Sequence, residues 1–491
     1  MAEEKKKRGI VKRIFKWIWL GIITLLILGA LIYDAPGKVI ALLLIILASC
    51  TILPKRAVKW FWLSIAAVVV ILIIWVFLPD ENGGWRPFTF EKELAALQAK
   101  YAVPDSENAA LLYSKLFETL DTDSNQPEFF NRAKTPSTDG PWRSADHPET
   151  AEWLKDQQKT IGTLLEICRL EKCSFPIIAS LIDPEYMKYR PKMRMCAFLL
   201  VSSANNDVAE GRTDAACRKY LAIIQMAKHL YQQPALIDLL VGVAVESLSL
   251  SRLNRFIIEN QPTDQQLESI ANLLSDLKDK WCDDFSRRLE YEKLFDKNYV
   301  CYLFYQINPQ GKVRFSRDPR AIMRAQHPEG FPEQLAHRRG KLDKAGTLIA
   351  WFFFPSSPQK ISEVIDAKFE GYYAMTKHDF DWSKKHPEVR PHFKLNYTSI
   401  VEQLADMSGQ TYSRIHEIYL RILTYRRGSR LLVAIRQYKN EKGNWPEDLN
   451  AIKSLAPAEA FIDPAYGSRF EYETYDKNFS LYGGQTNIWP K

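Results

Sequence analysis

Residues 213–260 read TDAACRKYLAIIQMAKHLYQQPALIDLLVGVAVESLSLSRLNRFIIEN, and this stretch decides the fold class. Apolar residues recur three or four positions apart, which predicts one helix over 213–232 and a second over 234–260. Thr263 is the expected cap of a third helix, which we expect to run beyond Tyr291. Joints this short make neighbouring helices antiparallel. The sequence therefore predicts a mainly α protein built on an array of helical hairpins.

The second of these helices is apolar on nearly all sides between Ala235 and Val245. Asp238, Glu246 and nearby serines make it too polar to cross a membrane. We therefore predict that it is the buried centre of the array, with Val241 and Val245 inside. Asp238 and Glu246 lie about 12 Å apart along the helix, a spacing at which both side chains can line one cleft.

Helical patterns also precede the array. Ser106 precedes a pattern that begins at Ala109, and Asp146 precedes a second pattern that reaches Ile167. The segment 211–234 loosely resembles tetratricopeptide-like repeats. No clean period of about 34 residues accompanies that likeness, so hairpins without a true repeat are favoured.

Three apolar stretches near the N-terminus indicate a membrane anchor: residues 14–33, 39–53 and 59–78. The first and third approach the roughly 20 residues that a membrane-crossing helix needs. The middle stretch is shorter and spans only if Lys38 and Lys55 extend toward the interface. The alternative is a two-span anchor in which 39–53 dips into the bilayer.

Basic residues orient this anchor. Residues 1–60 hold 11 Lys+Arg and 3 Asp+Glu, whereas the rest of the chain holds 55 of each. The positive charge lies before the first stretch and between the second and third, so these sides are expected to be cytoplasmic. The remainder is then periplasmic or extracellular. A neutral body also excludes nucleic acid as an expected partner, despite a net charge of +8.

Residues 311–395 break the helical pattern and are interpreted as an irregular connecting segment. The aromatic run 348–354 within it is interpreted as core, with docking on the bilayer surface as the alternative. His378, Asp379, Asp381, His386 and His392 gather nearby, but without a recognised ligand spacing we interpret them as a solvated loop and predict no metal site.

The six cysteines outside the anchor are interpreted as buried thiols, with a Cys168–Cys173 disulfide as the alternative. Asp283 with Arg287, and Asp284 with Arg288, have the four-residue spacing of ion pairs on a helix surface. No nucleophile motif, glycine-rich phosphate loop or zinc-protease motif is found in the sequence. The sequence thus assigns no catalytic, cofactor-binding or metal-ligating residue and predicts no cofactor.

The last hundred residues are the most informative part of the body. A long apolar stripe ends near Asn440, where Gly443 provides a helix stop. A short helix follows, and then two strands with alternating apolar residues that predict a β-hairpin. Because a lone hairpin is marginal in water, we expect a cluster over the long helix near Ile435 and Tyr438, and we expect residues 485–491 to be dispensable. The expected cluster consists of Trp445, Phe470, Tyr472, Phe479 and Leu481.

The order Tyr438-Lys-Asn-Glu-Lys-Gly443, Trp-Pro-x-x-Leu449, Asp-Pro-x-x-Gly467 and Phe-x-Leu-Tyr-Gly483 resembles the C-terminal segment of type II secretion pseudopilins. It also resembles membrane-anchored proteins of planctomycete and verrucomicrobial bacteria. The resemblance implies a helix-plus-sheet cap with a role in assembly. The pseudopilin processing site and the acidic calcium-binding tail are both missing, so we predict neither processing nor calcium.

These features predict four parts: a three-span anchor over 1–79, an α-helical array over 80–310, the irregular segment over 311–395, and a long helix with its cap over 396–491. We expect a multi-pass protein of a bacterial inner (cytoplasmic) membrane that acts as an extracytoplasmic interaction or assembly module. Its expected partners are the lipid bilayer and other envelope proteins. The alternative is an extracytoplasmic hydrolase whose active site lies between the array and the irregular segment.

Overall fold

The computed structural model describes most of the chain from Trp85 to Pro490. The described ranges are 85–120, 126–130, 136–179, 188–277, 279–315, 357–377, 380, 382, 411–475 and 478–490. The chain forms two compact units, described here one at a time: the larger contains 91–294, 372–384 and 410–491, and the smaller contains the remainder. The three predicted membrane spans lie outside the described residues. Within the described ranges, no helix has both the length and the apolar character that a membrane crossing needs.

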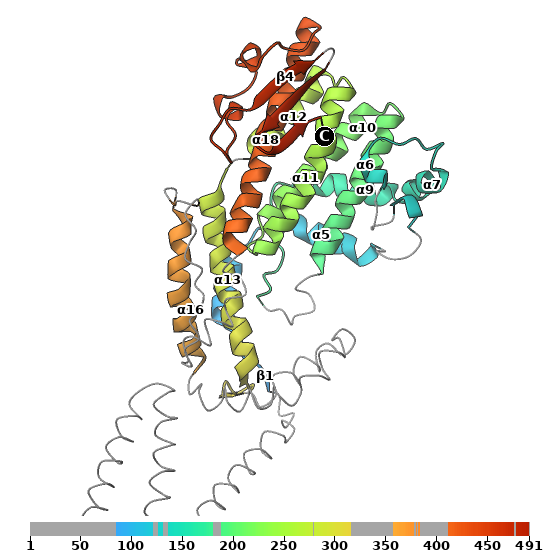
Figure 1. The fold of residues 1–491 in the computed structure, drawn as a ribbon. Helices are drawn as coiled ribbons and strands as arrows, with labels where there is room; N and C mark the ends of the chain where they lie inside the picture. The colour runs from blue at the N-terminus through green and yellow to red at the C-terminus, as the bar shows by residue number, and fades with distance from the viewer. Residues whose placement is uncertain are drawn as a thin grey trace, which may run out of the picture. The chain divides into compact units, whose positions relative to one another are not determined.

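The core of the larger unit is a set of three long helices drawn in green in Figure 1. These are α9 (Tyr189–Ala209), α10 (Thr213–Tyr231) and α11 (Leu236–Glu259). Helix α10 packs against α11, as the short joint between them predicted, and it also packs against α9. Gly242 makes the α10–α11 contact close, because a Cβ at this position would lie 2.8 Å from the ring of Tyr231. Val245 is buried as predicted, whereas Val241 is half-buried.

Helix α9 is a correction to the sequence interpretation, which described no helix between Ile167 and Thr213. It is buried on nearly all sides and presents no single apolar stripe. Several of its buried residues are polar, including Ser202, Asn205 and Asp207. A helix of this kind carries no periodic signal, because periodicity arises only when one face meets water.

The helix after Thr263 is a second correction. Thr263 caps α12 (Asp264–Asp276) with a reciprocal capping box, as expected. The helix ends there, however, and α13 (Trp281–Phe304) begins after a break. The side chain of Asp279 accepts a hydrogen bond from the Trp281 backbone N–H at 3.2 Å. That bond satisfies a donor at the start of a new helix and explains the separation.

Shorter helices cover the array on its N-terminal side. They are α4 (Glu91–Lys100), η1 (Asp105–Glu107), α5 (Ala109–Thr119), η2 (Glu128–Phe130), α6 (Pro136–Asp139), α7 (Pro148–Asp156) and α8 (Gln158–Ile167). Both predicted amphipathic helices are present, the second as the pair α7 and α8. The cap of α5 is Asn108, whose side chain accepts from the Ala110 N–H at 3.1 Å, and not Ser106.

The long C-terminal helix α18 (Thr411–Lys442) contacts α11 and α12, and Figure 1 shows the red C-terminal strands lying over it. Gly443 follows with a positive φ of 82°, as expected of a helix stop. We call residues 443–490 the cap. It contains η4 (Leu449–Ile452), η5 (Ala458–Phe461) and the strands β4 (Glu471–Tyr475), β5 (Asn478–Gly483) and β6 (Thr486–Trp489).

The cap contains a three-stranded antiparallel sheet in the order β4-β5-β6, whereas the sequence predicted a two-stranded hairpin. Residues 485–491 were expected to be dispensable because they were thought to lie outside the packed cap. That expectation is wrong, because Ile488 is fully buried in β6. A Cβ on Gly428 of α18 would lie 2.6 Å from the Ile488 side chain, so strand and helix pack without a gap. Strand β6 therefore belongs to the cap's core.

The predicted aromatic cluster of the cap is present. The ring of Phe479 lies 4.8 Å from Trp445 and 5.3 Å from Tyr472, centroid to centroid. Phe470 and Leu481 are buried as well. On α18, Ile435 is fully buried and the guanidinium of Arg436 lies 4.8 Å from the Trp445 ring. The expectation that the sheet covers the preceding helix is confirmed.

The smaller unit contains an antiparallel sheet of β1 (Arg86–Pro87), β2 (Tyr305–Ile307) and β3 (Val313–Phe315). Helix α16 (Pro358–Tyr373) follows, and its last two residues belong to the larger unit, as does η3 (Ala374–Thr376). Strand β3 and helix α16 lie in the segment that the sequence predicted to be irregular. Within this unit Lys297 pairs with Asp366 at 3.0 Å. The aromatic run 348–354 lies outside the described residues.

Candidate functional site

Asp238, in the first turn of α11, is the centre of a buried polar cluster. Its carboxylate accepts hydrogen bonds from Arg190 Nε at 2.6 Å, Arg190 Nη2 at 3.1 Å and the Tyr189 hydroxyl at 2.6 Å. Only 1% of the Asp238 side chain is exposed. Burial alone lowers the pKa of Arg190, but hydrogen bonding and charge attraction from Asp238 outweigh it and raise that pKa. The pair is therefore a buried contact that is closed to solvent.

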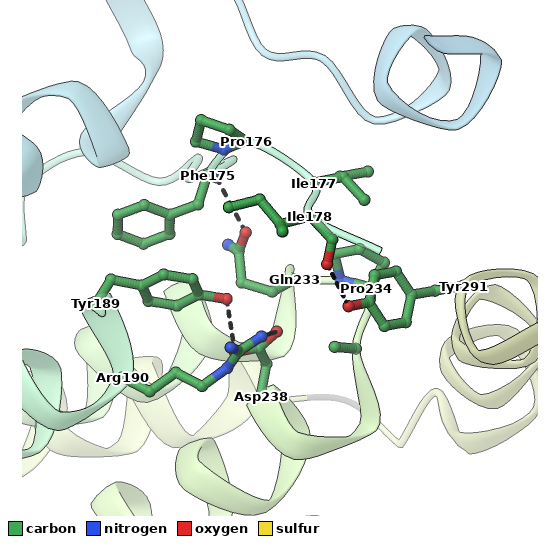
Figure 2. A pocket seen from close by; sticks show the side chains of 11 residues that line it. Phe175, Pro176, Ile177, Ile178, Tyr189, Arg190, Gln233, Pro234, Asp238 and Tyr291 are labelled. Carbon is green, nitrogen blue, oxygen red and sulfur yellow. Dashed lines mark hydrogen bonds and ion pairs between the residues drawn. The ribbon is translucent and has the colours of Figure 1, made fainter. Parts of the chain in front are cut away.

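A small hollow adjoins this cluster, and Figure 2 shows the side chains around it. Its volume is about 10 Å³, which is room for one water molecule and not for a substrate. Gln233 forms one wall and accepts a hydrogen bond from the Phe175 N–H at 3.0 Å. Tyr291 donates to the Ile178 carbonyl at 2.7 Å. These hydrogen bonds hold the segment 173–178 against the helices, so the hollow is a packing feature of the fold.

Glu246 repeats the arrangement two turns further along α11. It accepts from Arg426 Nε at 2.6 Å, Arg426 Nη2 at 2.8 Å and the Tyr231 hydroxyl at 2.5 Å. The Glu246 side chain has no exposed surface. Burial lowers the pKa of Arg426, but the neighbouring carboxylate reverses that effect and raises it. Because Arg426 lies on α18, this ion pair joins the array to the helix that carries the cap.

The two clusters share one design. In each, an acid of α11 receives a two-pronged arginine from another helix, and that arginine lies over the ring of the tyrosine that also binds the acid. The sequence analysis placed Asp238 and Glu246 at the spacing of a cleft lining. That interpretation is wrong, because each carboxylate is enclosed by its own partners. The arginines lie 48 and 180 residues away along the chain, which no local pattern reveals.

The charged residues of α13 are also not what their spacing predicted. Arg288 was expected on a helix surface, yet it is fully buried. It donates to the Tyr231 carbonyl at 2.9 Å and lies 3.9 Å from Asp284. Burial lowers its pKa to about 10, against the attraction of Asp284. Arg287 pairs with Asp284, three residues earlier, at 3.2 Å. This pair takes the place of the expected contact between Arg287 and Asp283, four residues earlier.

Glu292, one turn further along α13, accepts a hydrogen bond from the Leu236 N–H at 2.9 Å, at the first residue of α11. Burial raises the pKa of Glu292 to about 7, the hydrogen bond from Leu236 opposes that rise, and Asp238 adds to it. A carboxylate at a helix N-terminus is favoured by the helix dipole. Glu292 therefore holds the start of α11. No sequence pattern singles Glu292 out as a functional residue.

His229 of α10 is fully buried beneath α5. Its Nδ1 lies 3.2 Å from the Tyr113 hydroxyl and its Nε2 lies 2.8 Å from the Leu170 carbonyl oxygen. Burial lowers the pKa of His229 to about 4, so the ring is neutral at pH 7. Cys168 lies 3.7 Å from the same hydroxyl, and burial raises the pKa of its thiol to about 12. A protonated thiol with tyrosine interposed is not an activated nucleophile.

Ser203 and Lys219 form a further pair, with Lys219 Nζ 2.6 Å from the serine Oγ. Serine–lysine pairs carry out hydrolysis when the lysine is neutral and takes the serine proton. Here Lys219 also donates to Asp207 at 2.5 Å, and Arg212 binds the other oxygen of Asp207 at 2.7 Å. The Lys219 amine is thus shared between Ser203 and an ion pair with Asp207, so this pair is structural.

The cysteines of the described residues are all free, and Cys168 and Cys173 do not form the alternative disulfide. The residues of the predicted solvated loop lie outside the described residues, so that interpretation stays a prediction: His378, Asp379, Asp381, His386 and His392. Among the residues that the structure does describe, no group of three or more histidine, cysteine or acidic side chains is placed to hold a metal ion.

A hollow of about 440 Å³ lies on the surface of the cap, which we call the cap groove. Residues of η4, η5 and β4, with their neighbours, form its walls: Leu449, Asn450, Lys453, Ala458, Phe461, Ile462, Arg469, Phe470 and Tyr472. This volume falls in the range of ligand-binding sites. The sequence analysis did not identify it, because the three wall segments come together only when Arg469, which precedes β4, pairs with Ile462.

A second groove of about 300 Å³ lies between α9 and α11, with Phe198 and Leu248 among its lining residues. Arg252 on its rim is already engaged by Asp139 and the Thr138 carbonyl. No protein-family model, curated protein or solved structure matched the chain. The function is therefore inferred from the residues and their arrangement.

Proposed function

We propose that this protein is a membrane-anchored, extracytoplasmic interaction module that binds another envelope protein through its cap. The anchor and its orientation rest on the apolar stretches and basic residues of the first 80 positions. The single observation that carries the binding role is the concentration of apolar surface on the cap, combined with charges inside the helical array that are fully committed to internal contacts.

The apolar surface is unevenly distributed. Seven large apolar side chains are exposed among the described residues, and four of them belong to the cap: Leu455, Ile462, Tyr466 and Tyr475. Tyr466 has 56% of its surface exposed, the largest value of the seven. Exposed apolar residues that gather beside a groove are typical of protein-binding surfaces, whereas scattered ones carry no such meaning.

The buried charged residues of the described helices are not placed to act as catalytic acids or bases. Asp238, Glu246 and Lys219 are each held by ion pairs of 2.6 Å or less. His229 is fully buried, and its two ring nitrogens lie against the Tyr113 hydroxyl and the Leu170 carbonyl. A catalytic acid or base needs an approach for its substrate. The hydrolase alternative stays a prediction from sequence, since its cleft was expected beside a segment that lies largely outside the described residues.

Site-specific photocrosslinking in intact cells tests the proposal. A photoreactive amino acid replaces Ile462 at the groove, and in a matched variant it replaces Lys155, which is exposed on α7. We expect one discrete protein adduct from position 462 and none from position 155. Equal labelling at the two positions, or none at either, contradicts an interaction through the cap.

A reporter fused after Lys491 tests the orientation. The proposed topology predicts activity from a reporter that works only outside the cytoplasm. Activity from a cytoplasm-specific reporter contradicts it and favours the two-span anchor.

A further inference from the structure

The charges of the cap groove are all of one sign. Lys453 and Arg469 are its charged lining residues, and the lining contains no acid. The remaining walls are apolar or aromatic, apart from the amide of Asn450. A low-dielectric surface flanked by two cations favours a ligand that combines apolar groups with negative charge.

These two cations differ from the other basic residues nearby. Arg430 pairs with Glu459 at 3.3 Å, and Arg427 donates to the Ile462 carbonyl at 2.8 Å. Lys453 and Arg469 are both exposed, and within the described part of the chain their side chains take part in no hydrogen bond or ion pair. Lys453 acts on the Asp448 carboxylate through its charge but forms no ion pair with it, so both cations are available to a partner.

The edge of the adjacent sheet narrows the choice of partner. Strand β4 is at one end of the sheet, and its residues Glu471 and Glu473 are exposed. Charged side chains on an edge strand discourage the addition of a further strand. An acidic partner would also be repelled along this edge. The favourable contact is thus the groove, where side chains insert beside Lys453 and Arg469.

We infer that the cap groove binds a segment of another protein in which carboxylates flank large apolar side chains. This inference rests on the proposed function, and it adds the chemistry of the partner. A protein segment fits this composition, because Ile462, which lines the groove, is one of the four large apolar side chains that the cap exposes. The apolar side chains fill the hollow, and the carboxylates meet the two cations at its rim.

The test uses three labelled peptides of equal apolar content and the full-length chain in phosphatidylcholine nanodiscs, which carry no net charge. The peptides are Gly-Glu-Phe-Leu-Glu-Phe-Gly and its Gln and Lys counterparts, each capped at both ends. Fluorescence anisotropy gives the dissociation constants. We expect the Glu peptide to bind about fivefold more tightly than the Gln peptide, since exposed ion pairs are individually weak. The Lys peptide should bind least.

Reversing the charges of Lys453 and Arg469 distinguishes charge-specific peptide binding from non-specific binding. The double variant K453E/R469E should reverse the order, so that the Lys peptide binds most tightly. The matched control K155E/K159E changes charge equally at exposed positions of α7 and α8 and should leave the order unchanged. Both variants alter only exposed side chains, so a thermal melt equal to that of the parent chain is expected for each.

Equal binding of the three peptides, or no binding, overturns the inference about charge. An unchanged preference in K453E/R469E overturns the assignment to the cap groove. The crosslink from position 462 is read independently of these results. An adduct without peptide discrimination leaves the interaction role standing and removes only the acidic, apolar partner.

Discussion

The interior of the helical array and the surface of the cap use charge in opposite ways. In the array, Asp238 and Glu246 each meet an arginine and a tyrosine hydroxyl with nothing left over. On the cap, Lys453 and Arg469 flank apolar side chains that face solvent. Buried ion pairs fix which helices meet, because an alternative packing would leave a charge unpaired. Unpaired surface cations have no such structural task and are available for binding.

Removing one partner of a buried pair should have the largest effect on stability. Arg426→Met leaves Glu246 without its cation in a fully buried position. We expect a loss of about 3–5 kcal/mol in the free energy of unfolding. Urea unfolding of the full chain followed by tryptophan fluorescence measures it.

The double variant E246L/R426M is the matched control, since it removes both charges and keeps apolar volume. It should recover most of the loss, although the Tyr231 hydroxyl then lacks its acceptor. If the double variant is as unstable as Arg426→Met, the pair does not act as a unit.

The second prediction compares the core of the cap with that of the array. Ile488→Ala removes a fully buried side chain and should cost about 3 kcal/mol. Gly428→Ala alone should also destabilise, because its Cβ would meet Ile488 at 2.6 Å. In the double variant the new methyl group enters the space left by isoleucine, so the two losses should not add. Simple additivity in thermal unfolding would show that the two residues are not in contact.

Titration of Glu292 should have a smaller effect. Its pKa rises from 4.5 to about 7 on folding, so the folded state binds the proton more tightly than the unfolded state. The contribution of Glu292 to stability is therefore greatest below pH 4.5 and declines as the pH rises to 7, by about 2 kcal/mol after allowance for partial exposure. Glu292→Gln keeps an acceptor for the Leu236 N–H and should remove this decline. Melting temperatures of both proteins between pH 4.5 and 8 measure it.

His229 should change stability with pH in the opposite direction to Glu292, and the same melting temperatures measure both effects. Its pKa falls from 6.5 to about 4 on folding, so stability declines as the pH falls from 6.5 toward 4. The Glu292→Gln variant should retain this acid decline. If it loses the acid decline as well, the two groups are not independent.

The smallest effect is expected on the surface of the cap. Ile462→Ser and Tyr466→Ser each replace an exposed apolar side chain and should change the free energy of unfolding by less than about 0.5 kcal/mol. Both variants should weaken binding of the Glu peptide, and Tyr466→Ser should also weaken the crosslink from position 462. A large loss of stability would mean that these side chains support the cap's core, and the contrast with the array would disappear.

Much of the fold could be predicted where the physical cause is local. Apolar periodicity located α10 and α11, the Thr263 capping box marked the start of α12, and Gly443 marked the end of α18. Alternation identified β4 and β5, because one face of that pair meets the helix. The third strand was missed: only two of its four residues are buried, and its pairing depends on a turn at Gly484.

The sequence by itself therefore determined the helical class, the bounds of α10 and α11 to within two residues, and the existence of a cap, since capping, turns and amphipathic faces depend on neighbouring residues. Only the tertiary structure decided the partners of Asp238 and Glu246, the burial of Arg288 and the position of α9. It also assembled the cap groove from three separate segments. These features depend on contacts between residues far apart in the chain. A local pattern records that a charge needs a partner, but not which residue provides it.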